Sequence, residues 1–296
     1  MKRTNVTNIP LEICRLIDKQ NTSHVDCADI SCTALIDSPL IRQLRKKYKD
    51  SDEIVVDYAD DLYKLGGHIV HWLIENLEQN SLKVPTLMAE CKGMTISGVT
   101  DSVVFHEGLI KDYKYTSIFV VERALKEGFS SWENQLNVYG WLMRQMPEVW
   151  AKIVEIKDMR IVAWSRDFGP RHRAEGLHQI ETVAMPVWKD QAAVQRYIEN
   201  RVSLHKMAES VDTPARCSDS EMWVKPEQFA AMKKGAKKAL KLCKSWDEAE
   251  QYITKEQVPG GYVEQREKEY PRCAGYCEFG RCGKCPYWDK AQCKTW

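Results

Sequence analysis

The stretch from residue 87 to residue 121 constrains the fold more than any other part of the sequence. Its apolar and polar residues alternate, β-branched side chains are frequent, and Gly93, Gly98 and Gly108 lie where turns are expected. Such alternation is typical of half-buried strands, so the stretch predicts a meander of roughly three strands. Segments on both sides show helical periodicity instead, which predicts a mixed α/β protein of the α+β kind.

Helical patterns precede and follow these strands. Ser38-Pro39 opens a pattern with apolar residues at helical spacing, and Ser130 and Glu133 have the spacing of a capping box before an apolar run. A pattern interrupted at Gly66-Gly67 predicts a helix pair or a kinked helix. The expected elements are a helix from residue 39, helical structure over 53–80, a helix over 131–146, strands within 150–165 and 178–187, and helices over 189–209, 226–243 and 246–254.

These patterns divide the chain into three expected parts. Residues 1–52 form an N-terminal helical segment, residues 53–210 the core, and residues 211–296 a C-terminal segment that is helical and then rich in cysteine. We expect the C-terminal segment to pack on the core.

Length and charge exclude several classes of protein. With 296 residues and 44% hydrophobic residues, the chain is long and apolar enough to bury a sizeable core, so it is not a disordered tail. No run of roughly 18 apolar residues occurs, and no apolar segment follows the basic start, so we expect a soluble, cytoplasmic protein without a membrane partner. The net charge of +1 gives no general attraction to nucleic acid, and any such binding has to be local.

The tripeptide Asp112-Tyr113-Lys114 and the nearby Asp101 carry the clearest chemical signal. On a strand, Asp112 and Lys114 point to one face and Tyr113 to the other, and Asp101 can lie on the neighbouring strand. Two carboxylates and an ammonium group on one face are costly to desolvate unless a cation lies between the carboxylates. Magnesium prefers such oxygen ligands. Asp101, Asp112 and the Tyr113 carbonyl would hold it, and Lys114 would orient or deprotonate a water, an arrangement suited to phosphodiester hydrolysis.

Three further spacings accompany this tripeptide. His71 and Gly67 lie four residues apart on an expected helix, and Gln135 and Tyr139 lie one turn apart on another. In chain order the sequence carries Gly67-x-x-x-His71, Gly98-x-x-Asp101, Asp112-Tyr113-Lys114 and Gln135-x-x-x-Tyr139. This order resembles the motifs of the RecB-like branch of the PD-(D/E)xK nuclease superfamily.

The resemblance implies a restriction-endonuclease-like core, a mixed central sheet flanked by helices, over residues 53–210. It implies that His71, Asp101 and Asp112 bind Mg²⁺ or Mn²⁺ and that Lys114 is catalytic. Gln135 and Tyr139 would line the site or contact DNA. Tyr115 departs from the family, in which many relatives have a small residue after the lysine, and this puts the shape of the substrate channel in question.

Five of the eleven cysteines, Cys273, Cys277, Cys282, Cys285 and Cys293, fall in the last 24 positions. In a chain without an export signal, clustered thiols indicate metal or iron-sulfur ligands rather than disulfides. The spacing permits a zinc knuckle, and it also permits an iron-sulfur site with one ligand far upstream.

The family resemblance extends to this tail. Several RecB-like nucleases, including the CRISPR adaptation exonucleases, carry a 4Fe-4S cluster on one upstream and three C-terminal cysteines, and phage-encoded members have a similar tail. The resemblance implies Cys217, Cys273, Cys277 and Cys285 as the ligands. Cys282 is the main substitute for Cys285, Cys32 is the rival upstream ligand, and Zn²⁺ is the alternative to the cluster.

Together these features predict a metal-dependent exonuclease that acts on DNA ends or single strands in recombination, repair or phage DNA processing. A single-strand or structure-specific endonuclease of the same fold is one alternative, and a catalytically silent DNA- or protein-binding module is another. Because the chain lacks a phosphate-binding Gly-x-x-x-x-Gly-Lys loop, a helicase, recombinase or annealing protein is an expected partner. Lysine-rich stretches at 42–49 and 233–241 are candidate DNA contacts, the second on a helix face.

Overall fold

The computed structural model describes residues 1–296 apart from 22–27, 78–84, 153–154 and 290–296. The chain forms two compact units, Met1–Pro214 (unit 1) and Ala215–Trp296 (unit 2), which are described separately. Both combine strands with helices, so the predicted mixed α/β class is confirmed. No described helix is long and apolar enough to cross a bilayer.

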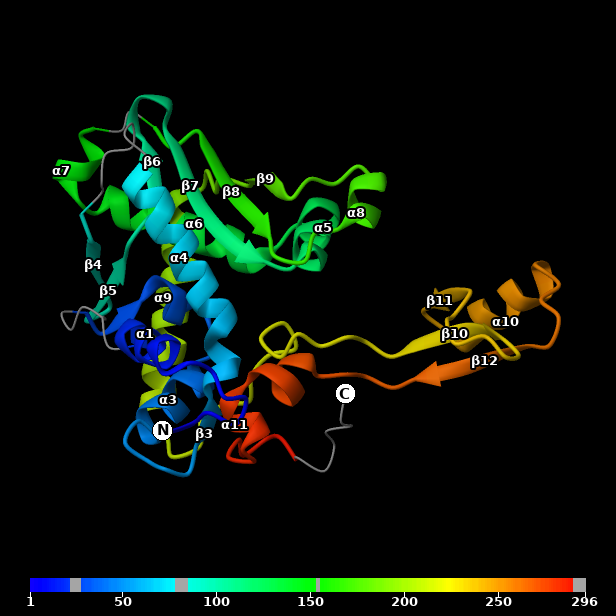
Figure 1. Ribbon diagram of the computed structural model, residues 1–296. Coiled ribbons are helices and arrows are strands. Elements are labelled where there is room, and N and C mark those ends of the chain that lie inside the picture. Colours follow the sequence, from blue (N-terminus) through cyan, green and yellow to red (C-terminus); the bar gives the residue numbers. More distant parts are fainter. Residues whose placement is uncertain (22–27, 78–84, 153–154, 290–296) are drawn as a thin grey trace. The chain divides into compact units, whose positions relative to one another are not determined.

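Unit 1 contains a four-stranded sheet with the order β6, β7, β8, β9. The four strands run side by side in Figure 1, with β7 and β8 parallel and the two outer strands antiparallel to their neighbours. The strands are β6 (Ser102–Val104), β7 (Leu109–Thr116), β8 (Asp158–Ser165) and β9 (Ile180–Met185). The two last strands lie within the predicted ranges.

The predicted meander is divided between two sheets. β4 (Leu87–Cys91) and β5 (Met94–Gly98) pair as a hairpin, and β5 also pairs in parallel with β2 (Ile30–Ser31). β6 and β7 belong to the four-stranded sheet instead. The stretch therefore contains four strands rather than three, and partners distant in sequence, β2 and β8, determine which sheet each strand joins.

Helix α6 (Ser130–Arg144) is the central helix of unit 1. Leu136, Val138, Leu142 and Met143 are fully buried, and the helix contacts strands of both larger sheets as well as α2 (Cys32–Ile36) and α9 (Gln191–Glu209). Further helical elements of the unit are α1 (Leu11–Asn21), α3 (Pro39–Lys47), η2 (Phe105–Glu107), α5 (Ile118–Glu127), α7 (Pro147–Trp150) and α8 (Pro170–Ala174), besides η1 and α4, which are described below.

The starts of α3 and α6 lie close to the predicted positions, but only one of the two predicted N-caps is present. At α3, the Ser38 hydroxyl accepts from the Ile41 amide and Pro39 occupies the first turn, as expected. At α6, the predicted capping box is wrong, because Phe129 is the N-cap residue and makes no side-chain cap bond. The Glu133 carboxylate accepts from the Trp188 indole at 2.5 Å instead.

The prediction of a helix pair or kinked helix over 53–80 is wrong in its first third. Val55–Asp57 form strand β3, which pairs in parallel with β1 (Lys2–Thr4), and η1 (Tyr58–Asp61) leads into α4 (Leu62–Leu77). Residues 78–80 lie outside the described residues. Helix α4 continues through Gly66-Gly67, and a Cβ atom at Gly66 would lie 2.8 Å from the Tyr115 ring. The glycine therefore permits close contact with β7 rather than breaking the helix.

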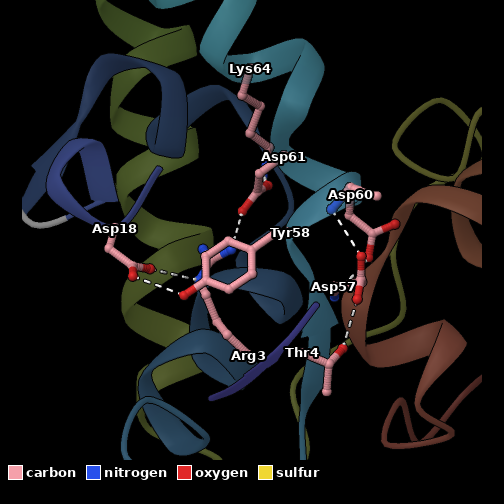
Figure 2. Close-up of polar contacts among 9 residues, drawn as sticks. Arg3, Thr4, Asp18, Asp57, Tyr58, Asp60, Asp61 and Lys64 are labelled. Atoms are coloured by element: carbon pink, nitrogen blue, oxygen red, sulfur yellow. Dashed lines mark hydrogen bonds and ion pairs between the residues drawn. The ribbon is translucent and has the colours of Figure 1, made fainter. Parts of the chain in front are cut away.

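An ionic network ties the N-terminal strand to the start of α4 (Figure 2). Arg3 on β1 pairs with Asp61 at 2.8 Å and with Asp18 on α1 at 3.4 Å. Tyr58 donates to Asp18, and Lys64 pairs with Asp61 at 2.6 Å. Asp61 is only 4% exposed, and although burial by itself raises its pKa, Lys64 and Arg3 hold that pKa below its usual value. The buried carboxylate thus stabilises the fold as an anion.

Unit 2 contains a three-stranded antiparallel sheet with the order β11, β10, β12. The elements are β10 (Gln228–Lys233), β11 (Lys241–Cys243), α10 (Trp246–Lys255), β12 (Gly261–Arg266), the π-helical turn η3 (Arg272–Tyr276) and α11 (Glu278–Arg281). The predicted helix over 226–243 is wrong, because this segment is the β10–β11 hairpin. Pairing of β10 with β12 overrides the local helical periodicity.

Candidate functional site

The structure brings together the polar residues predicted for unit 1. Asp112 and Lys114 lie on β7, His71 on α4, and Gln135 and Tyr139 one turn apart on α6. Asp101 directly precedes β6, which pairs with β7. Three elements and one loop therefore supply a single site beside the middle of the sheet.

Gln135 connects three of the other side chains. Its amide nitrogen donates to Asp112 Oδ1 at 3.1 Å and lies 2.9 Å from the Tyr139 hydroxyl, and its amide oxygen accepts from Lys114 Nζ at 3.0 Å. Lys114 Nζ also pairs with Asp112 Oδ2 at 2.6 Å. This pair confirms that Asp112 and Lys114 share one face of β7. Because every polar atom of the Gln135 amide is engaged, the carboxylate and the ammonium group are held in fixed positions.

Asp101 joins the site from the other direction. Its Oδ2 accepts from the backbone amide of Tyr113 at 2.7 Å, and its Oδ1 lies 3.2 Å from His71 Nδ1. The hydrogen bond with Asp101 raises the pKa of His71, against the opposing effect of its burial. Asp101 therefore contacts the backbone of Tyr113 through the amide, whereas the predicted metal ligand is the Tyr113 carbonyl.

Asp112 is the most buried charged group of the site, with 2% of its surface exposed. Its pKa is raised to about 6, chiefly by burial; the nearby Asp101 acts in the same direction, and Lys114 and His71 act in the opposite direction. Burial also raises the pKa of Tyr139 well above its usual value, which keeps that hydroxyl neutral. A site with two neighbouring carboxylates, one deeply buried, favours a bound cation.

The donor types fit a hard divalent cation, since carboxylate oxygens and an imidazole are available side by side. In this structure, however, these side chains are not arranged around a common metal position. Across the described part of the chain, no three His, Cys, Asp or Glu side chains converge to hold a metal ion. His71 pairs with Asp101 and Lys114 with Asp112, so each acidic group of the site already has a basic partner.

Unit 2 contains the predicted cysteine site. Burial raises the pKa of the Cys273 thiol to about 12, and the neighbouring Cys277, Cys217 and Cys285 raise it as well. The four predicted ligands are therefore close enough to interact electrostatically, although they do not converge on one point. Cys282 ends helix α11, where its amide donates to the Glu278 carbonyl. Cys293 lies outside the described residues.

Cys32, the rival upstream ligand, is a core residue of unit 1. Its thiol is almost fully buried and lies 3.6 Å from the Gln135 carbonyl, directly behind the site. Burial and the negative charge of Asp112 both raise its pKa far above the usual range.

Sequence reasoning named Gly98 as part of a motif but missed its role in packing. Gly98, expected at a turn, is the last residue of β5, and a Cβ atom there would lie 2.8 Å from the Tyr139 ring and 2.9 Å from Leu142. The signal was its place in the same motif series as Tyr139. Gly98 leaves room for Tyr139 and Leu142 beside β5, so α6 can lie close to the strands that carry Asp112 and Lys114.

Comparisons with known proteins find distant structural similarities. The sequence matches no protein-family model and no curated protein. Among solved structures, the crystal structure of SSO0001 has 18% identity and a TM-score of 0.45, covering 68% of this chain and 88% of its own. A phage-related exonuclease from Haemophilus somnus 129PT has 14% identity and a TM-score of 0.27, covering 68% of this chain and 83% of its own.

Proposed function

We propose that the protein is a metal-dependent DNA exonuclease that hydrolyses phosphodiester bonds at DNA ends or in single strands. The observation that carries this proposal is the connected set formed by Asp112, Lys114 and Gln135, with Asp101 and His71 beside it. It places two carboxylates, an imidazole and one ammonium group at one sheet face. Hydrolysis of a phosphodiester needs such groups to bind a cation, activate water and neutralise the phosphate.

The proposed cation is Mg²⁺ or Mn²⁺, held by His71, Asp101 and Asp112 with the Tyr113 carbonyl. When bound, it would supply Lewis-acid polarisation of a phosphate oxygen and a more acidic water. It would also relieve the repulsion that raises the pKa of Asp112. Donor type and charge support this assignment.

Lys114 has the central catalytic role in this proposal. Asp112 and Gln135 hold its ammonium group from two sides, so its position is determined before substrate arrives. There it orients the attacking water and neutralises negative charge that develops on the phosphate. The water oxygen bonds to phosphorus, the bond from phosphorus to the leaving sugar oxygen breaks, and that oxygen takes up a proton.

Gln135 and Tyr139 are positioning residues in this scheme. The Gln135 amide orients both Asp112 and Lys114, and the neutral Tyr139 hydroxyl fixes the orientation of that amide. Burial of Gln135 and Tyr139 within α6 keeps them out of reach of solvent. Their substitution should disturb the catalytic pair more than substrate affinity.

We assign the cysteine site of unit 2 to a 4Fe-4S cluster, with Zn²⁺ as the alternative, on Cys217, Cys273, Cys277 and Cys285. A positively charged metal centre would compensate the mutual repulsion that these four thiols exert as thiolates. The role is structural: Cys217 lies 56 residues before Cys273, so a shared centre would close a long loop and stabilise an irregular segment. Hydrolysis needs no redox step.

The proposed setting is recombination, repair or phage DNA processing in the cytoplasm. A helicase, recombinase or annealing protein would supply the ends or single strands, because the sequence has no nucleotide-binding loop for unwinding.

The decisive test compares wild type with Lys114→Ala on end-labelled linear DNA and on circular single strands, with Mg²⁺, with Mn²⁺ and with a chelator. Lys92→Ala is the matched control, because Lys92 follows Glu90 at the same spacing but its ammonium group contacts Ser203 at 3.2 Å and Glu199 at 3.9 Å, and neither belongs to the candidate site. We expect Lys114→Ala to lose about 10²–10³-fold in rate and the control to keep full activity.

Each other outcome has a definite meaning. Cleavage that survives Lys114→Ala would overturn the site assignment. Cleavage of circular single strands would identify an endonuclease instead. DNA binding by the wild type without cleavage under any metal condition would identify a catalytically silent binding module.

A further inference from the structure

A small module of unit 2, residues 228–266, has a fold of its own. Strands β10, β11 and β12 form its sheet, and α10 covers one face. Ala231, Cys243 and Ala249 form the buried centre between sheet and helix, with Phe229, Tyr252, Ile253 and Val263 around them. The catalytic proposal uses none of these residues.

The other face of this sheet is exposed at its two outer strands, β11 and β12, whereas Ala230 and Met232 of the middle strand are buried. Pairing places Ala230 opposite both Leu242 and Glu264, and Met232 opposite Tyr262, so these side chains share the face away from α10. Leu242 is 47% exposed and Tyr262 45%. An aromatic ring and an aliphatic side chain thus reach solvent at the outer strands of this face.

A lysine-rich turn borders this face. Residues 233–244 contain six lysines and no acidic residue. Lys234, Lys237 and Lys238 are exposed in the connection between β10 and β11, and within the described residues none of the three forms an ion pair. Lys241 differs, because it pairs with Glu248 on α10 at 3.4 Å.

The acidic groups near the module do not cancel this charge. Glu248 is engaged by Lys241, and Asp247 and Glu250 belong to α10, on the far side of the sheet. Glu264, the acidic residue on the face away from α10, pairs with Arg266 at 3.2 Å. The turn therefore presents uncompensated positive charge next to an apolar and aromatic surface.

From this arrangement we infer that the module binds a single strand of DNA. Lys234, Lys237 and Lys238 contact consecutive phosphates, and bases lie against Tyr262 and Leu242. Single strands match both features, since they combine phosphate charge with exposed base faces, whereas a duplex offers mainly the charge. The inference rests on the proposed nuclease function and adds a second DNA contact outside the catalytic site.

The test measures binding of a fluorescent oligothymidine to the full-length protein in a chelator, over a range of salt concentrations. Replacing Lys234, Lys237 and Lys238 together with glutamine should reduce the slope of log affinity against log salt by about 2, at roughly 0.7 for each lost phosphate contact. Tyr262→Ala should weaken binding about tenfold and leave the slope unchanged. Replacing three exposed lysines of unit 1, Lys126, Lys152 and Lys189, with glutamine is the matched control.

An unchanged salt slope in the hairpin triple variant would refute the inference, as would equal losses in the hairpin and control variants. Equal weakening of duplex and single-strand binding by Tyr262→Ala would refute the single-strand assignment. Failure of the nuclease proposal is separable, because it is read from cleavage by Lys114→Ala with metal, whereas this inference is read from binding in a chelator. Unchanged circular dichroism and melting temperature of each variant establish that its fold is retained.

Discussion

His205 on α9 leads to a quantitative prediction about acid stability. The imidazole is fully buried, and its Nε2 lies 3.0 Å from the Leu35 carbonyl, which can only accept a hydrogen bond. Nε2 therefore carries the proton of the neutral ring. Nδ1 is buried and has no hydrogen-bond partner among the described residues, so a second proton there would remain uncompensated.

Burial, with help from Arg201 and Arg42, lowers the pKa of His205 to about 4, while the Leu35 carbonyl and Glu209 act in the opposite direction. In the unfolded chain the pKa is about 6.5. The unfolded state therefore binds the proton first as pH falls, and stability that is fully present above pH 6.5 is lost on the way down to pH 4. Linkage gives a loss of about 2 kcal/mol at pH 5 and about 3 kcal/mol below pH 4.

The measurement is urea unfolding at several pH values between 7.5 and 5, followed by circular dichroism. Hydrogen exchange of α9 peptides assigns the transition to unit 1. In His205→Gln the fall in unfolding free energy between pH 7.5 and 5 should be smaller by about 2 kcal/mol, whatever the variant costs at neutral pH. His106→Gln, at an exposed position, is the control. Equal pH dependence in wild type and His205→Gln would refute this account of the buried imidazole.

Three further predictions concern the site and its supports. Gly98→Ala should lower the unfolding free energy by about 1–3 kcal/mol and lower the cleavage rate, because the added Cβ would displace Tyr139. Gly275→Ala is the control: its Cβ meets no atom within 4 Å, so it should be neutral in melting and cleavage assays. Arg3→Met should cost about 1–3 kcal/mol at pH 7 by removing a partner of the buried Asp61. Since the pKa of Asp61 is held low, that cost should shrink as pH falls below 4 in chemical unfolding experiments, and a constant cost would contradict the assignment. Cys273→Ser should lose bound iron or zinc in metal analysis and should make the C-terminal segment sensitive to protease. Cys243→Ser, in the small module, should keep the metal. Metal loss without any effect on the stability of the C-terminal segment would exclude a structural role.

The positions of the proposed catalytic residues could be predicted because their signals are local in sequence. Alternation on β7 is enough to place Asp112 and Lys114 on one face, and one-turn spacing on α6 is enough to place Gln135 beside Tyr139. Their mutual contacts could not be predicted in the same way. The bonds from Gln135 to Asp112 and Lys114 depend on how α6 lies against the sheet, and that packing depends on Gly98.

The sequence by itself determined the mixed α/β class, the extents of α3, α6, α9 and α10 to within a few residues, and the chemical types at the site. These features follow from periodicity and from short-range spacing, which depend only on neighbouring residues. Tertiary structure alone decided how the strands divide between sheets, the continuity of α4 through Gly66, and the hairpin at residues 228–243. In each of these cases a partner far along the chain, β2 and β8 for the sheets, Tyr115 for α4 and β12 for the hairpin, provides contacts that outweigh local preference.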